Sequence, residues 1–478
     1  MKKDRFNDFD KEVRDLVLDF ERTVLKGERQ FYDIDELEVI IDYYLEVNDQ
    51  EPLEQAIRYA EYLYPDSTEV RIRRAHQLIS QQFVEMAIDL LQELREREPD
   101  NTDVAYSLGV AYGAKDEPEK AISLYEEALA DGWMPGRVYS NIAEEYYKLA
   151  DYPQAIAYYE MALHYDPSDE VSIYNYYDTC LIARRLEQAV TTLTDLTKKD
   201  PYNRHAWYVL GMAQRELGLY DRAADALQFA IAIDKSFVDA YVALSQVQDL
   251  AGDTPQAVTT MLRLLDHTDM HDRVYRTVGN LYARDGNFDT AMLYYRKAID
   301  HNPADAEAFA ASGMCFLHQG DLPSALASVR KALNLEDALV EQRGDGGDAE
   351  VFFAAALVHD AAGHFDMASE CYERMILAQN CNEAQCQAYT QFLFDHQVYD
   401  ILIEFGEESL ALYPRDTFYS TYLAAAYFYT NRYNKARKML PDVDPQLLAE
   451  LCPGIIAHPL LGPLVPPPAD PKDPLGEW

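Results

Sequence analysis

The amino-acid sequence predicts an all-α protein built from a repeated pair of short helices. Three observations support this fold class. A 34-residue period runs through most of the 478 residues, and apolar residues recur at helical spacing within each period. Ala stands at the twentieth position of the period in ten of twelve repeats, which suits a close approach of two helices. Pro stands at the thirty-second position in six repeats, where it ends the second helix.

One repeat illustrates how each part of the period is used. Residues 136–169 read GRVYSNIAEEYYKLADYPQAIAYYEMALHYDPSD. Small side chains at three positions let the helices approach closely, and two tyrosines fill the space between them; these residues are Ala143, Ala155, Ala162, Tyr146 and Tyr159. Because one helix pair cannot bury its apolar face alone, neighbouring pairs are expected to stack into a solenoid.

This period resembles the tetratricopeptide repeat. That repeat has eight characteristic aromatic, apolar, small or Pro positions, and in residues 136–169 they are filled by Tyr139, Ile142, Ala143, Tyr146, Ala155, Tyr159, Ala162 and Pro167. The resemblance covers residues 34–450. It implies a right-handed α-solenoid, a superhelix of helix-turn-helix repeats whose first helices line a concave face.

The register of the period divides the chain into five segments. Nine repeats run without a slip over residues 34–339, and three further repeats, the last one imperfect, occupy residues 349–450. Three glycines between them, in residues 340–348, predict a flexible loop insertion about which the later repeats can pivot. Residues 1–33 are expected to form an N-terminal capping helix, and residues 451–478 an apolar cover followed by a Pro-rich tail.

Both ends of the chain have a distinct composition. Residues 5–26 place apolar side chains at steps of three and four, which predicts one amphipathic helix with the stripe Phe6, Phe9, Val13, Leu16, Val17, Phe20 and Val24. We interpret this helix as the cap of the solenoid; a helix that binds a partner is the alternative. The six prolines of residues 462–478 predict an extended or disordered tail that ends at Trp478.

The charge balance excludes several classes of protein. Lys and Arg number 42 and Asp and Glu 83, a formal net charge of −41, so binding to nucleic acid or to an anionic membrane surface is not expected. No apolar run approaches the length of a membrane helix, and the first residues turn acidic where a signal peptide turns apolar. Six Cys in a chain of this length do not form a disulfide framework. We therefore expect a soluble cytoplasmic protein.

The sequence contains no pattern for catalysis or for binding a cofactor. A Gly-rich phosphate loop, HExxH and GxSxG are all absent. Several His and Cys residues gather between positions 359 and 396, but the spacing of Cys381 and Cys386 lies outside that of structural zinc sites. His359 and Cys386 also fall on core positions of the repeat. We expect no enzyme activity, no cofactor and no metal.

The resemblance implies that ligand contacts come from the first helix of each repeat. In the eighth repeat these positions share one helix face and hold Arg273, Arg276, Asn280 and Arg284. Three guanidinium groups on one face favour an anionic partner such as a carboxylate-bearing peptide. The alternative is that neighbouring acids such as Asp239 and Glu307 neutralise them.

Aromatic and apolar residues occupy the same positions in other repeats. Tyr106, Tyr174 and Tyr208 stand at the fifth position and are expected to form a ladder along the groove, among Tyr147, Arg137 and Arg215. Repeats nine to twelve contribute the apolar side chains Met314, Leu317, Phe353, Phe394 and Tyr422. These favour an open groove for a helix or an extended peptide, unless the C-terminal tail covers them.

These observations favour a non-catalytic scaffold or adaptor that binds a protein or peptide on the concave face, with acidic segments of the partner as the candidate contacts of the arginines. The alternative is a regulatory or assembly factor that binds a small ligand or signalling peptide in a pocket closed by movement about residues 340–348. Glycosyltransferase-type arrays carry a ladder of Asn at the sixth position of the repeat. Only Asn141 and Asn175 stand there in this chain, so that activity is not expected.

Overall fold

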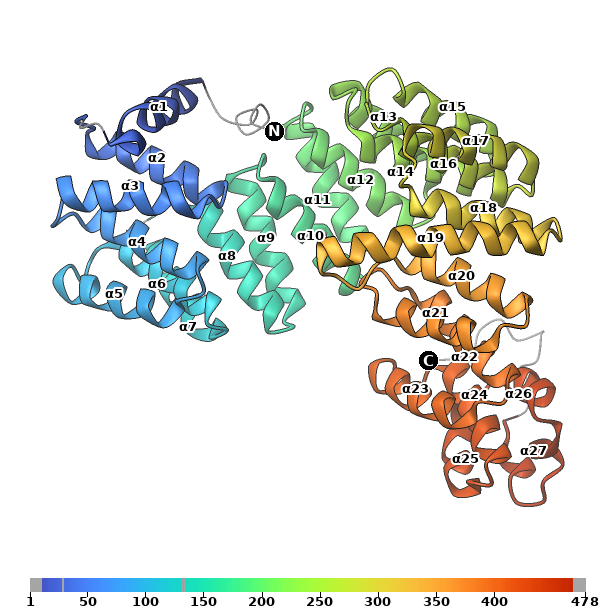
Figure 1. Cartoon of the computed structure of the whole chain (residues 1–478). Helices are drawn as coiled ribbons and strands as arrows, with labels where there is room; N and C mark the ends of the chain where they lie inside the picture. The colour runs from blue at the N-terminus through green and yellow to red at the C-terminus, as the bar shows by residue number, and fades with distance from the viewer. Residues whose placement is uncertain (1–10, 28–29, 131, 133, 467–478) are drawn as a thin grey trace. The chain divides into compact units, whose positions relative to one another are not determined.

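The computed structural model describes residues 11–27, 30–130, 132 and 134–466, and every regular element in these ranges is a helix (Figure 1). Phe6 and Phe9 of the expected N-terminal stripe, and the end of the tail with Trp478, lie outside the described residues. The chain forms two compact units, residues 1–260 and 261–478. Within the described ranges, no helix combines the length and the apolar character needed to cross a membrane.

The first unit contains α1 (Lys11–Arg22), η1 (Val24–Lys26), α2 (Ile34–Glu46), α3 (Gln50–Leu63), α4 (Thr68–Ser80), α5 (Val84–Arg97), α6 (Thr102–Ala114), α7 (Pro118–Ala130), α8 (Pro135–Lys148), α9 (Tyr152–Tyr165), α10 (Glu170–Ile182), α11 (Leu186–Lys199), α12 (Arg204–Glu216), α13 (Tyr220–Ile233) and α14 (Val238–Leu250). The boundary between the units falls within α15 (Thr254–Leu264).

The second unit continues with α16 (His271–Arg284), α17 (Phe288–His301), α18 (Ala306–His318), α19 (Leu322–Arg343), α20 (Ala349–Ala361), α21 (Phe365–Leu377), α22 (Glu383–Asp395), α23 (Tyr399–Leu412), α24 (Thr417–Tyr429), α25 (Tyr433–Met439), η2 (Leu440–Asp442), α26 (Pro445–Leu451), α27 (Pro453–Ala457) and η3 (Gly462–Leu464). Helices α2 to α25 follow one another as twelve hairpins, each with a first and a second helix.

The turn inside every hairpin has the same backbone conformation. One residue per turn has a positive φ, and these residues are Asn48, Gln82, Asp116, Ala150, Arg184, Gly218, Gly252, Gly286, Gly320, Gly363, Gln397 and Asn431. Successive positions lie 34 residues apart, except that the step from Gly320 to Gly363 is 43 residues, 34 plus the nine of residues 340–348. Seven of these twelve residues are not glycine. Since a left-handed backbone is unfavourable for a residue with a Cβ atom, these seven turns carry some strain.

The two helices of a hairpin approach closely where the period requires a small residue. Gly109 on α6 faces the ring of Tyr125 on α7, and a Cβ atom at Gly109 would lie 2.6 Å from that ring. Tyr125 is itself buried. The tyrosine therefore occupies the space that a larger residue at position 109 would need, which ties the two helices together.

Helix α1 packs against α2 at the start of the first unit. Val17 and Phe20 are fully buried, and the Phe20 ring meets the Tyr32 ring edge to face at a centroid distance of 5.7 Å. Tyr44 on α2 belongs to the same cluster. The apolar stripe of α1 thus covers the first hairpin.

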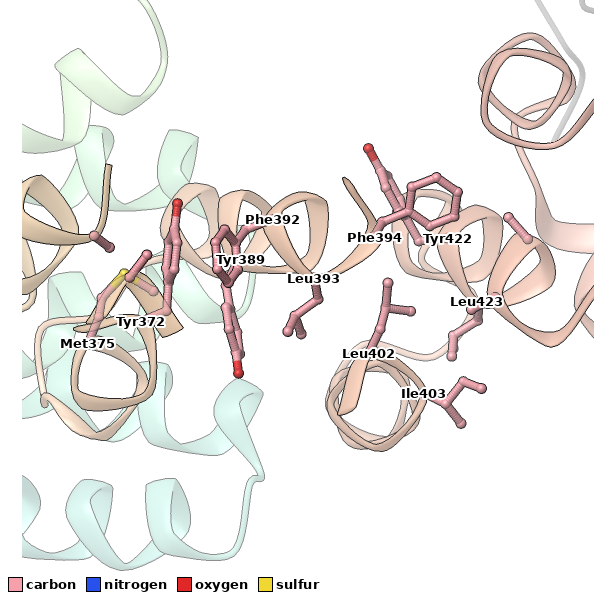
Figure 2. Packing of buried hydrophobic residues seen from close by; sticks show 14 of the residues in the cluster. Tyr372, Met375, Tyr389, Phe392, Leu393, Phe394, Leu402, Ile403, Tyr422 and Leu423 are labelled. Atoms are coloured by element: carbon pink, nitrogen blue, oxygen red, sulfur yellow. The ribbon is translucent and has the colours of Figure 1, made fainter. Parts of the chain in front are cut away.

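An apolar cluster runs through the last hairpins of the second unit (Figure 2). The Tyr372 and Tyr389 rings stack at 5.3 Å, and Phe394 meets Tyr422 edge to face at 5.4 Å. Beyond α25, η2 begins one residue before Pro441. Two short helices then follow, α26 and α27, and the cluster extends into them.

The loop expected over residues 340–348 is shorter in the structure, because residues 340–343 are helical and only residues 344–348 lie between α19 and α20. Helix α19 continues through Arg343, because no helix-breaking residue occurs before Gly344, which caps it with φ 72°. Glu336 accepts a hydrogen bond from the Asp348 amide at 3.0 Å and forms an ion pair with Arg343 at 2.7 Å. Asp348 in turn caps α20. The segment is therefore short and held at both ends.

We expect opposite effects from two substitutions in the hairpin turns. Ala150→Gly should raise the free energy of unfolding by about 0.5 to 1 kcal/mol, because glycine relieves the strain of φ 58° at a smaller entropic cost. Gly218→Ala should lower it by about 1 kcal/mol, and a Cβ atom there would meet no heavy atom within 4 Å, so only the backbone contributes. Urea unfolding followed by circular dichroism measures both. A change of the same sign in the unfolding free energy of both variants would contradict the backbone strain inferred for these turns.

Candidate functional site

A cavity of about 760 Å³ lies among the first helices of four successive hairpins, α2, α4, α6 and α8. The 34-residue period explains why these helices share a lining. Glu69, Asp103 and Arg137 stand at the same position of three consecutive repeats, one at the start of each helix. The cavity contains five carboxylates, two arginines and one histidine: Glu38, Asp42, Glu46, Glu69, Asp103, Arg73, Arg137 and His76.

Arg73 is already paired within this cavity. Its guanidinium donates to both oxygens of Asp42 at 2.9 Å and to Glu38 at 3.1 Å. Burial raises the pKa of Glu38, and the charge of Arg73 opposes that shift. These three side chains therefore form a closed ion-pair network that needs no ligand.

The other charges of the cavity have no such partner. Among the residues that the structure describes, no cationic nitrogen lies within 4.0 Å of the carboxylates of Glu46, Glu69 or Asp103. Arg137 is exposed and likewise has no carboxylate at that distance in the described ranges; its guanidinium lies 5.5 Å from the centre of the Tyr106 ring. These three carboxylates are exposed as well, and Glu69 accepts a hydrogen bond from the Ser67 hydroxyl at 2.7 Å.

His76 lies between these charged groups and stays neutral. Its Nε2 atom is 3.1 Å from the Ser107 hydroxyl. Burial lowers the pKa of His76 to about 4, and the nearby charges of Arg137 and Arg73 act in the same direction, whereas Asp42 opposes them. At neutral pH the cavity therefore has a surplus of negative charge.

Two of the expected contact residues, Tyr106 and Arg137, line this cavity, but the tyrosine ladder is incomplete. Tyr174 and Tyr208 lie 6.2 Å apart between ring centres, and the Tyr174 hydroxyl is 3.0 Å from Nδ1 of His205. Ser140 stands at the corresponding position of the repeat between Tyr106 and Tyr174, so the row is interrupted there.

The remaining expected residues of the first unit lie elsewhere. Tyr147 lines a smaller hollow of about 200 Å³ together with Asn175 and Asp178. Arg215 forms an ion pair with Glu216 at 2.6 Å and donates a hydrogen bond to Gln246 at 3.0 Å. Arg215 is therefore engaged with its own neighbours.

The arginine face of the eighth repeat lies on α16, and its central members have partners inside the fold. Arg276 donates to the two oxygens of the buried Asp305 at 2.7 and 2.8 Å and forms an ion pair with Glu307 at 3.0 Å. Asn280 accepts a hydrogen bond from the Tyr295 hydroxyl at 2.8 Å. The neutralising alternative applies to Arg276, because the next hairpin supplies two acids. Arg273 and Arg284 lie on the same helix.

The expected apolar groove of repeats nine to twelve is open only in part. Met314, Leu317 and Phe353 are half-buried. Phe394 and Tyr422, in contrast, are buried, with 9% and 4% of their surface exposed. Phe418 packs on Tyr422 at 4.6 Å, and Tyr399 and Tyr429 lie beside Phe394, so neighbouring rings fill this part of the groove: Phe418, Tyr399 and Tyr429.

A second surface hollow, which the sequence reasoning missed, lies on α21, α22 and α23. Its volume is about 270 Å³, and its lining combines apolar side chains with Glu373, Glu404 and Glu408. The one signal in the sequence for this hollow was the pair Glu404 and Glu408, which are four residues apart and therefore share a helix face near Phe405. That spacing does not reveal which residues of α21 lie opposite.

The His and Cys residues between positions 359 and 396 do not form a metal site. Within the part of the chain that the structure describes, no group of three or more His, Cys, Asp or Glu residues could hold a metal ion. Cys381 and Cys386 lie 3.6 Å apart between sulfur atoms, and Nδ1 of His359 is 3.4 Å from Nδ1 of His364.

We expect the ion pair of Arg276 to stabilise the second unit. Arg276→Gln should lower the free energy of unfolding of the second unit by about 2 to 3 kcal/mol, because it leaves the carboxylate of Asp305 buried without its cation. The matched change Arg296→Gln removes an exposed charge on α17 and should stay within about 0.5 kcal/mol. Urea unfolding of both variants checks this, and equal stability would show that the ion pair has no structural role.

His76 should make stability fall as the solution becomes acidic. Between pH 7 and 5 the unfolded chain takes up a proton at this residue, whereas folded His76, with a pKa of about 4, does not. The intact protein should therefore lose about 2 kcal/mol more than His76→Asn over this range, since the shared carboxylates contribute equally to both. Parallel pH profiles of the two proteins in urea unfolding would contradict the burial of a neutral histidine.

Comparison with known proteins assigns the family. A family model described as "Tetratricopeptide repeat" matches residues 72–133, 183–236 and 277–343, and a second model with the same description matches residues 136–169.

Two relatives and one solved structure illustrate how far the similarity extends. "TPR repeat-containing protein YpiA" of Bacillus subtilis (strain 168) is 24% identical over 249 residues, which are 45% of this chain and 58% of that protein. "Probable UDP-N-acetylglucosamine--peptide N-acetylglucosaminyltransferase SPINDLY" of Hordeum vulgare is 29% identical over 173 residues, 34% of this chain and 18% of that protein. The chain thus spans less than two thirds of either relative. The crystal structure of MamA has 26% identity and a TM-score of 0.29, covering 34% of this chain and 95% of MamA.

The family matches, the 34-residue spacing of the hairpin turns and the all-helical fold of the described residues agree with one another. The chain is a tetratricopeptide repeat protein.

Proposed function

We propose that this protein is a non-catalytic adaptor that binds peptide segments of partner proteins in the cavity of α2, α4, α6 and α8. The observation that carries the proposal is the set of unpaired charges around this cavity. Arg137, Glu46, Glu69 and Asp103 are exposed around the cavity, and in the described ranges none of them forms an ion pair within 4.0 Å. A cavity of about 760 Å³ also has room for several side chains of an extended peptide.

The charges define which peptide suits the cavity. Arg137 provides a bidentate donor for one carboxylate of the ligand, and its place over Tyr106 limits the directions in which it can point. Glu46, Glu69 and Asp103 attract Lys or Arg side chains. The peptide that suits the cavity therefore has one acidic residue, which binds Arg137, and basic residues next to it, which bind the three carboxylates. The surplus of negative charge speeds association with such partners and excludes wholly acidic ones.

The chemistry of the lining supports a binding role over a catalytic one. Ser107 and His76 are the one pair that could serve as nucleophile and base, but Ser107 is 1% exposed, and a histidine with a pKa of about 4 is a weak base. The similarity to SPINDLY involves 18% of that protein, so its printed activity is not carried over. All six cysteines are free thiols, which suits a site of action in the reducing cytoplasm.

A peptide selection tests the proposal. Twelve-residue random peptides displayed on phage are selected on the full chain, and the enriched sequences are synthesised with a fluorescent label. We expect enriched peptides to carry both Lys or Arg and a carboxylate. Arg137→Glu should weaken their binding about tenfold in fluorescence anisotropy, because it replaces an attraction by a repulsion among five carboxylates.

The matched control is Arg222→Glu, which reverses an exposed charge on α13, away from the cavity. It should change the affinity less than twofold. Peptides whose affinity falls equally in both variants would indicate attraction by net charge alone, and a selection without enriched peptides would exclude the cavity as a peptide site.

A further inference from the structure

The second helices α21 and α23 form a surface groove that is unlike the cavity of the first unit. Its floor consists of Ile376, Tyr389 and Phe405. Two further apolar side chains line it and are exposed, Leu377 at 75% and Ile401 at 41%. Exposed apolar residues that gather around a hollow, in contrast to single ones, mark a surface that binds another molecule.

Three carboxylates border this groove. In the part of the chain that the structure describes, no cationic nitrogen lies within 4.0 Å of Glu373, Glu404 or Glu408. Glu404 and Glu408 are one helical turn apart on α23, where like charges destabilise a helix. The adjacent Glu407, by comparison, forms an ion pair with Lys435 at 2.6 Å. The groove side of α23 thus has negative charge that the fold itself does not neutralise.

The interruption of the repeat register lies directly beside this groove. Gly346 approaches the C-terminus of α21 so closely that a Cβ atom there would lie 2.5 Å from the carbonyl oxygen of Leu377. Arg374 of α21 contacts α19 through an ion pair with Asp337. The extended α19 and residues 344–348 therefore hold the end of α21 in place, including the residue that carries the exposed Leu377 side chain.

We propose that this groove binds a cationic amphipathic helix of a partner protein. Apolar residues of that helix pack on Leu377, Ile401 and the floor, while its Lys or Arg residues pair with Glu373, Glu404 and Glu408. A second copy of this chain is a poor occupant, because two chains of net charge −41 repel each other. The proposal concerns a site separate from the cavity of α2 to α8 and does not depend on the function assigned to that cavity.

A model peptide tests the charge and the helical pattern together. The probe is an 18-residue fluorescein-labelled peptide of Lys and Leu, with Leu at helical spacing, titrated with the full chain at physiological salt in fluorescence anisotropy. A peptide of the same composition in scrambled order serves as the first control. We expect the ordered peptide to bind and to gain helical circular dichroism, whereas the scrambled peptide binds at least tenfold more weakly.

Variants then locate the site. Glu404→Gln combined with Glu408→Gln should weaken binding about fivefold, because two exposed ion contacts are lost. Leu377→Ala should weaken it about tenfold through the lost apolar contact, and this exposed residue can be replaced without disturbing the core. The matched control is Asp221→Asn with Asp225→Asn, an exposed acidic pair at the same spacing on α13, which should leave affinity within 1.5-fold.

Four outcomes would overturn the proposal. Equal binding of the ordered and scrambled peptides, or equal loss in the α23 and α13 variants, would show attraction by net charge without a groove. Binding that is lost in Glu46→Gln combined with Asp103→Asn, but kept in the α23 variant, would place the peptide in the cavity of the first unit instead. Absence of binding by the ordered peptide also excludes the groove.

Discussion

The contact between a large side chain on the second helix of a hairpin and a small residue on the first recurs in both units and lets the two helices approach closely. Gly109 with Tyr125 and Gly279 with Tyr295 repeat this contact in different units, and in both pairs a Cβ atom would come within 2.6 Å of the ring. Since the ring fills the space between the helices, the other faces of the hairpin remain apolar and need a neighbour. Stacking of hairpins, and with it the presence of surfaces made by several helices, depends on this contact.

Stacking brings side chains of equivalent positions next to each other, and their charges then decide what a surface can do. In the cavity of the first unit, Arg73 is used by Glu38 and Asp42, whereas Arg137 and Asp103 have no such partner. On α16 the balance is different, because Asp305 and Glu307 of the following hairpin neutralise Arg276. An arginine on the first helix is thus a binding group in one repeat and a structural group in another, according to the acids of its neighbour.

The irregular segment between Gly320 and Gly363 adds a different kind of constraint. It lengthens α19 to Arg343 and then returns through Gly346, which touches the backbone of Leu377. A periodic array has no such support at the end of its second helices. The acidic groove of α21 and α23 lies beside this break in the period, because Leu377 is one of its lining residues.

The sequence by itself determined the helices, their pairing and the positions of the turns, because each of these depends on residues within one period. Ala155 and Tyr159 are buried in the hairpin where the repeat pattern places them, and the hairpin turns follow the 34-residue spacing. Glycines suggested a loop at residues 340–348, but α19 continues to Arg343 and the loop begins at Gly344. Only the tertiary structure decided that Arg276 is paired with an acid and that neighbouring rings cover Phe394 and Tyr422. It also decided that Leu377 and Glu404, on different helices, line the same groove. These outcomes depend on contacts between different helices, and the distance between two charges or two apolar side chains on different helices is set by packing, which a linear pattern does not specify.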